Sequence, residues 1–128
     1  MLACTGKFQD EKFQPLVIKP QKVLYNVVSS IAMDYKLGVL VPDESQKSSA
    51  IIRWADSAEK VLVEAASPYD KIEYIEQAAK RLSKQKIDMT VLDCIGYTQD
   101  MKDIVFEVTG KPVILARSVA ARVIQELL

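Results

Sequence analysis

The sequence predicts an α/β fold: a parallel sheet of about four strands with helices on both faces. Short apolar runs alternate with longer segments of helical spacing, and only a few residues connect them. The apolar runs are nearly continuous, which is typical of parallel strands buried on both faces. Such strands are joined by right-handed crossovers. We expect the strand order 2-1-3-4, as in flavodoxin-like sheets.

The four expected strands are apolar runs bounded by turn residues. Gly38 precedes the first run and Pro42 stops it. The expected strands are 39–41, 61–65, 89–93 and 112–116. Residues 7–20 are expected to form a loop with a short extended piece at 16–18, because Pro15 and Pro20 interrupt them without a clean period.

The expected helices have apolar residues three and four positions apart, at about 21–35, 46–58, 72–86 and 99–108, with a last one after residue 118. Their ends carry characteristic residues. These are Pro20 in the first turn of the first helix, Asp43 or Ser45 as cap of the second, Ser67 as a cap of the third, Gly110 after the fourth, and Ser118 as cap of the last.

The composition excludes several classes of site. The 128 residues are enough for one core, and the 17 basic residues balance the 17 acidic ones, so neither nucleic acid nor an anionic membrane is an expected partner. There is no histidine and there are two cysteines, which leaves no Cys-His pair, no histidine metal site and no four-thiolate zinc site within the chain. We expect no metal or cofactor. No apolar run approaches the roughly 18 residues of a membrane span, so a cytoplasmic location with reduced thiols is expected.

Cys94 is the first candidate for chemistry, because it stands where the third strand should end. Ligands bind beyond the carboxyl ends of strands in open α/β sheets. A thiol at that place can act as a base, an acid or a nucleophile. Gly96 permits close approach of a ligand, and Thr98 can bind a carboxylate. The alternatives are a cysteine that packs as a small hydrophobe and a plain loop with a helix cap.

Cys4, Thr5 and Gly6 form a second group of the same character, a thiol followed by a hydroxyl and a glycine. Its alternative is a frayed terminus. Two thiols that face each other across a ligand can remove a proton from one side of a carbon and return it on the other, as in a racemase or isomerase.

The other expected strand ends add candidates around the same pocket. Pro42 and Ser67 follow the first two strands, and turn formation and capping are the alternative explanation for them. Arg117 follows the last strand and can bind an anionic group, or be a solvated arginine.

Several motifs together resemble the carboxyl-terminal half of the AroM family, which is similar to the aspartate/glutamate/hydantoin racemase superfamily. The matching segments are Leu92–Thr98 followed by a helix, Gly110–Leu115, Arg117-Ser118 with the helix to Leu128, Leu37–Pro42 and Ala3–Gly6. The resemblance implies two similar α/β domains with a small-carboxylate pocket between them and a cysteine from each domain facing the substrate. It implies Cys94 and Cys4 as these cysteines, with Thr5, Gly6, Gly96, Tyr97 and Thr98 around the ligand. Ile95 stands where many racemases have threonine.

The resemblance also implies a domain organisation. Relatives have roughly another hundred residues before the first cysteine, as two domains of ordinary size require. We therefore expect residues 1–20 to be a remnant of a first domain and residues 21–128 to be a complete second domain. If the chain is active, the resemblance implies a cofactor-independent racemase or isomerase. The alternative is a non-catalytic binding or assembly module that self-associates as a dimer, because an exposed strand edge is a template for association.

Overall fold

The computed structural model describes residues 2–3 and 16–128. It has a four-stranded parallel sheet in the order β4-β3-β5-β6. The strands are β3 (Lys36–Val41), β4 (Lys60–Ala65), β5 (Met89–Leu92) and β6 (Val113–Leu115). Numbered along the chain, this is the predicted order 2-1-3-4, so the flavodoxin-like arrangement is confirmed.

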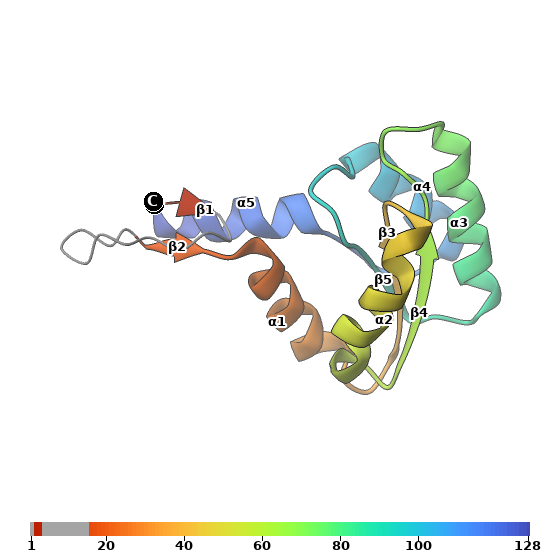
Figure 1. Ribbon diagram of the computed structural model, residues 1–128, viewed down its shortest axis with the longest axis horizontal. Coiled ribbons are helices and arrows are strands. Elements are labelled where there is room, and N and C mark those ends of the chain that lie inside the picture. Colours follow the sequence, from red (N-terminus) through yellow and green to blue (C-terminus); the bar gives the residue numbers. More distant parts are fainter. Residues whose placement is uncertain (1, 4–15) are drawn as a thin grey trace.

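Helices cover both faces of the sheet (Figure 1). One face packs against α1 (Pro20–Ala32) and α2 (Lys47–Trp54), and the other against α3 (Ile72–Lys84) and α4 (Gln99–Thr109). Two 3₁₀ turns, Glu44–Gln46 and Ala55–Ser57, flank α2. The last helix, α5 (Ala116–Leu127), runs away from the body of the sheet.

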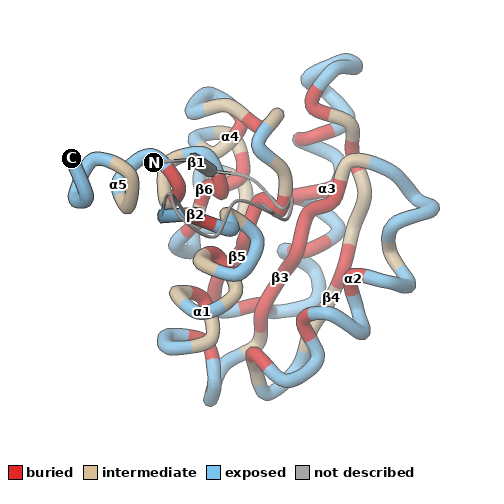
Figure 2. Tube along the Cα trace, turned by 60° about the vertical axis from the view of Figure 1, so that its left-hand side comes forward, coloured by how far each residue is buried: buried red, intermediate tan, exposed pale blue. Residues whose placement is uncertain are grey.

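The side chains of β3 alternate between two cores, as a strand buried on both faces requires. Leu37 and Val39 pack with α1 and α2, whereas Leu40 packs with α3 and α4. Figure 2 shows β3 buried along its length. The apolar run that predicted this strand is therefore explained by its burial on both faces of the sheet.

Two boundaries near the first strand differ from the prediction. The α1 helix ends at Ala32, before the predicted residue 35, because the Tyr35 amide donates to the Ala32 carbonyl in a turn (2.9 Å). The strand β3 then begins three residues earlier than predicted. The Lys36 amide donates to the Asp88 carboxylate (2.8 Å), which fixes the start of the strand.

Two predicted helix caps are wrong. The α5 helix begins at Ala116, directly after β6, so Ser118 lies inside it and Leu115 occupies the cap position. The third helix, α3, has Lys71 at its cap position, and Ser67 instead accepts a hydrogen bond from the Tyr69 amide (3.0 Å) in the preceding turn.

Of two other predicted helix ends, the one at Gly110 is confirmed, whereas α2 itself has Gln46 at its cap position and no side-chain cap. Asp43 caps the 3₁₀ turn before α2 by accepting from the Ser45 amide (3.3 Å). Gly110 ends α4 in the left-handed conformation (φ 66°), which glycine adopts without a Cβ penalty.

A second, two-stranded sheet lies apart from the main one. In it β1 (Leu2–Ala3) pairs in parallel with β2 (Val17–Ile18). Figures 1 and 2 both place this pair beside α5. Residues of β2, the first turns of α1 and Val123 of α5 line a common hollow, so the pair belongs to the arm that α5 forms.

Candidate functional site

The carboxyl ends of β3, β4 and β5 meet at one edge of the sheet. The chain passes from β3 to β4 on one side, and β5 pairs with β3 on the other. The strand order therefore reverses between β3 and β5, and this is where ligands bind in open α/β sheets. The loop 93–98, which follows β5, starts at that point.

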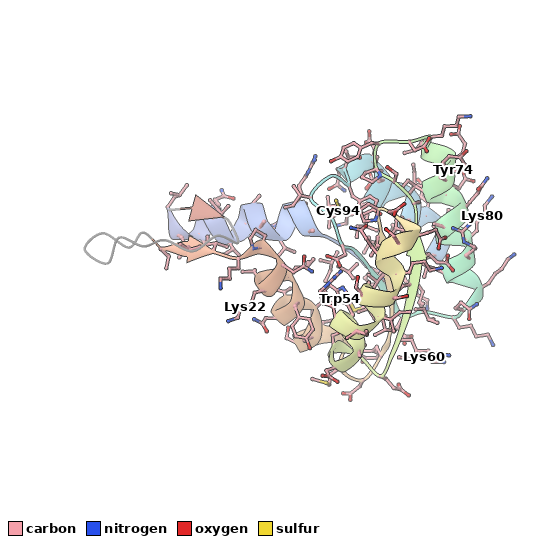
Figure 3. The ribbon with its side chains drawn as sticks, viewed as in Figure 1. Lys22, Trp54, Lys60, Tyr74, Lys80 and Cys94 are labelled. Carbon is pink, nitrogen blue, oxygen red and sulfur yellow. The ribbon has the colours of Figure 1, made fainter. Side chains whose placement is uncertain are left out.

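Cys94 lies in this loop, half-buried, and packs against the core on the α3 and α4 side. The Gly96 amide donates to the Cys94 sulfur (3.3 Å). A backbone donor of this kind stabilises negative charge that develops on sulfur. In Figure 3 Cys94 lies where α5 leaves the body, with Trp54 on the α2 side of it.

Asp93, the neighbour of Cys94, is a buried carboxylate with three side-chain donors. Its side chain accepts from Gln21 Nε2 (3.2 Å) at one oxygen, and from Trp54 Nε1 (2.9 Å) and the Arg53 guanidinium at the other. Its backbone amide donates to the Leu40 carbonyl (2.9 Å), one residue beyond the end of β5. Helices α1 and α2 thus both hold this residue.

A small cavity of about 40 Å³ lies against both residues. It is lined by Pro20, Gln21, Leu24, Asp93, Cys94, Ile95 and Ala116. The first turn of α1, the loop after β5 and the start of α5 therefore line this cavity together. Cys94 thus lines a cavity and also packs against the core, so the reactive role predicted for it stays a prediction.

The glycine of the loop lies under the β4–α3 turn. A Cβ placed on Gly96 would come within 2.5 Å of the Tyr69 hydroxyl and 3.0 Å of Pro68. The absence of a side chain at Gly96 thus lets Pro68 and Tyr69 pack against it. The predicted contact of Gly96 with a ligand stays a prediction.

The next two loop residues have structural partners. Tyr97 is fully buried, and its hydroxyl donates to the Ala66 carbonyl (2.7 Å). Burial first, and then negative charge at Cys94 and Asp93, raises the pKa of Tyr97 above its ordinary value. The Thr98 hydroxyl caps α4 by accepting from the Met101 amide (3.3 Å). Neither contact tests the predicted ligand binding.

Arg117 lies in the first turn of α5 and reaches the same loop. Its Nε donates to the Ile95 carbonyl (3.1 Å), and the residue is exposed. The Arg117 guanidinium therefore contacts the residue that follows Cys94 in the loop.

Pro42 and Ser67 come together, but in a different pocket. They line a hollow of about 280 Å³ between the ends of β3 and β4 and helix α3, with Tyr74 on its far wall. None of the residues that line the Cys94 cavity lines this pocket. Cys4, Thr5 and Gly6 lie outside the described residues, so their predicted roles stay predictions.

Residues 2–3 and 16–128 contain neither a cluster of metal ligands nor a membrane-spanning helix. No group of three or more cysteine, aspartate or glutamate side chains there is placed to hold a metal ion. No helix in the same part of the chain has the length and apolar character needed to cross a membrane.

The comparison with protein families decides the relationship. A family model described as AroM protein matches residues 1–128. The chain belongs to the AroM family. The comparison of the AroM chain with curated proteins found no match. Membership covers both cysteine segments, and the resemblance seen in the motifs is therefore confirmed at the level of the family.

Sequence reasoning missed the residues that hold Asp93 in this AroM chain. Arg53 and Trp54 are 40 and 39 positions away from it, and Gln21 is 72 positions away. One signal was available, an acidic residue at the end of an otherwise apolar run. A carboxylate there must find buried donors, but the sequence does not say on which helices they lie.

Proposed function

We propose that the AroM chain carries an acid–base site of the racemase or isomerase type for a small carboxylate, with Cys94 and Cys4 as the proton-transfer groups. The observation that carries the proposal is the placement of Cys94. Its thiol is half-buried, lies against a cavity at the reversal point of the sheet and receives a backbone donor from Gly96.

The chemistry needs one base and one acid on opposite sides of a carbon. A Cys94 thiolate removes the proton next to the substrate carboxylate and becomes a thiol, while the electron pair stays on the substrate. A second thiol then gives its proton to the opposite side of that carbon and becomes a thiolate. The exposed guanidinium of Arg117, next to the Cys94 loop, supplies the contact for the carboxylate.

Support for the cysteine pair comes from the described residues before Cys4. Ala3 pairs with Ile18 in the β1–β2 sheet. Two residues after Ile18 comes Pro20, which lines the cavity at Cys94.

As a domain organisation we propose that residues 21–128 form one α/β domain and residues 1–20 belong to a first domain, as in the two-domain superfamily.

Solvent exchange is the direct test. The unmodified chain is incubated in D₂O with both enantiomers of small amino and hydroxy acids, dicarboxylates included, and exchange at the carbon next to the carboxylate is followed by NMR. We expect exchange with at least one substrate. Cys94→Ser should abolish exchange of one enantiomer and Cys4→Ser that of the other, because each thiol serves one side of the carbon.

Alkylation of the thiols supplies the control. Iodoacetamide with mass-spectrometric analysis measures each cysteine separately in the folded chain, and a bound dicarboxylate should slow the reaction at Cys94. Arg117→Gln should weaken that protection with little change in the reaction of the free chain. A Cys94 thiol that reacts only after unfolding would show that it is a core residue, and the proposed function would then be wrong.

A second candidate is a non-catalytic module that self-associates. It is favoured by the β1–β2 pair, which stands outside the main sheet, since two strands alone are marginally stable in water. Leu16, just before β2, and Leu127 in the last turn of α5 are also exposed. Light scattering over a range of concentrations should show a dimer, and a monomer throughout would contradict this candidate.

A further inference from the structure

The Arg53–Asp93 ion pair lies next to Cys94 and is not used by the acid–base step. The Asp93 side chain is only 3% exposed, whereas the Arg53 side chain is 38% exposed. The charge of the pair is thus buried on the carboxylate side and open to solvent on the guanidinium side. An isolated buried carboxylate is strongly disfavoured, so the three donors must compensate it.

The electric fields of Asp93 and Cys94 reach the same place. Both side chains line the 40 Å³ cavity, and negative charge on either raises the pKa of Tyr97. A carboxylate that was not neutralised at this position would repel both a thiolate and an anionic ligand. The guanidinium of Arg53 cancels that charge at the point where it arises.

We propose that Asp93 and Arg53 are positioning residues of the Cys94 site, which hold the thiol loop against α1 and α2 and set the charge that an anionic ligand meets there. This inference rests on the proposed function, since it concerns the same thiol. It adds that selection for an anion depends on a neutralised pair beneath the thiol as well as on any residue that touches the ligand.

Two alkylating reagents that differ in charge test this inference. Iodoacetate is an anion and iodoacetamide is neutral. Both transfer a carbon to the Cys94 sulfur with loss of iodide. The ratio of their rates at Cys94 therefore reports the charge around the sulfur, whereas loosened packing raises both rates together. Mass spectrometry measures the ratio at Cys94 separately from Cys4.

The two variants should move the ratio in opposite directions. Arg53→Gln exposes the Asp93 charge, so the iodoacetate-to-iodoacetamide ratio should fall by roughly threefold or more at low salt. Asp93→Asn removes the negative charge and leaves Arg53 in place, so the ratio should rise by a similar factor. Both changes should be smaller in 0.5 M salt, because dissolved ions screen the charges of the pair and of iodoacetate more strongly there.

The ion pair between Arg81 and Glu64 (2.9 Å) supplies matched controls, because it joins α3 to β4 and lines no part of the Cys94 cavity. Arg81→Gln and Glu64→Gln should leave the ratio unchanged. Trp54 is the only tryptophan and donates to Asp93, so its fluorescence shows whether each variant keeps the native environment.

The outcomes separate the two proposals. If Cys94 reacts in the folded chain but the ratio is the same in Arg53→Gln as in the unmodified chain, the inference about the pair is wrong and the proposed function stands. If Asp93→Asn fails to fold, Arg53→Gln alone decides, because Gln21 and Trp54 still donate to the Asp93 carboxylate in that variant. If Cys94 does not react before unfolding, both proposals fail.

Discussion

At the scale of single residues, Tyr97 shows how a loop beside the candidate site is fixed. The buried Tyr97 hydroxyl donates a hydrogen bond to the Ala66 carbonyl. Tyr97→Phe removes this donor and leaves the carbonyl without it, so we expect a loss of about 1–2 kcal/mol in the free energy of unfolding. Urea denaturation measures the change.

The matched control for that variant is Tyr69→Phe. Tyr69 also lies near the Cys94 loop, but it is 83% exposed. Loss of its hydroxyl should change the free energy of unfolding by less than about 0.5 kcal/mol. An equal loss in both variants would show that the buried hydrogen bond of Tyr97 contributes nothing of its own.

Asp43 gives a prediction of pH dependence. The Ser45 hydroxyl, and then the Ser45 amide, donate to its carboxylate and hold the pKa of Asp43 below its ordinary value. A lowered pKa in the folded state stabilises folding above the unfolded pKa of about 4, and this gain is lost as the pH falls through the lowered pKa. NMR titration of the Asp43 carboxyl carbon should give a midpoint below the ordinary value of an aspartate, and Ser45→Ala should raise that midpoint because the hydroxyl donor is removed.

At this scale the sequence could predict where a residue lies relative to the end of a strand. Cys94 was expected at a strand end, and it is there. The partners of Asp93 could not be predicted, because they come from two helices that precede it by dozens of residues. Residue type tells that a buried carboxylate needs donors, whereas only the packing of α1 and α2 decides which donors reach it.

At the scale of elements, α4 is the helix whose ends the sequence predicted best. Thr98 caps its start and the left-handed Gly110 closes its end. Both signals are local, since a cap and a positive φ depend on one or two residues. Helices α3 and α5 instead begin at Ile72 and Ala116 with no side-chain cap, so their starts depend on tertiary packing.

Thr98 was also a predicted ligand residue, and its capping role can be separated from that role. Thr98→Ala should lower the free energy of unfolding by about 1 kcal/mol, because the Met101 amide loses its acceptor. Thr98→Ser keeps the hydroxyl and should restore most of this loss. If Thr98→Ser folds stably but protection of Cys94 by a dicarboxylate disappears, the methyl group contacts the ligand.

At the scale of the whole molecule, the order of the strands was predictable. The presence of separate pockets at the carboxyl ends of these strands was not. Alternating strands and helices with short connections fix a parallel sheet, and the observed order is the predicted one. Of the predicted site residues, however, Cys94 lines one pocket and Pro42 and Ser67 line another, whereas Gly96, Tyr97, Thr98 and Arg117 line neither. Sequence spacing places residues at one edge of the sheet. It does not predict the path of the loop 66–70, which lines the Pro42 pocket and packs against Gly96.

The junction between β6 and α5 has a mechanical consequence. The strand passes into the helix without an intervening loop, and Arg117 in the first helical turn holds the Ile95 carbonyl. Continuous backbone joins the strand to the helix, one hydrogen bond joins the helix to the thiol loop, and α5 extends beyond the sheet (Figure 1). We therefore expect a molecule bound to the outer half of α5 to change the alkylation rate of Cys94, because the helix is attached to the backbone beside that thiol.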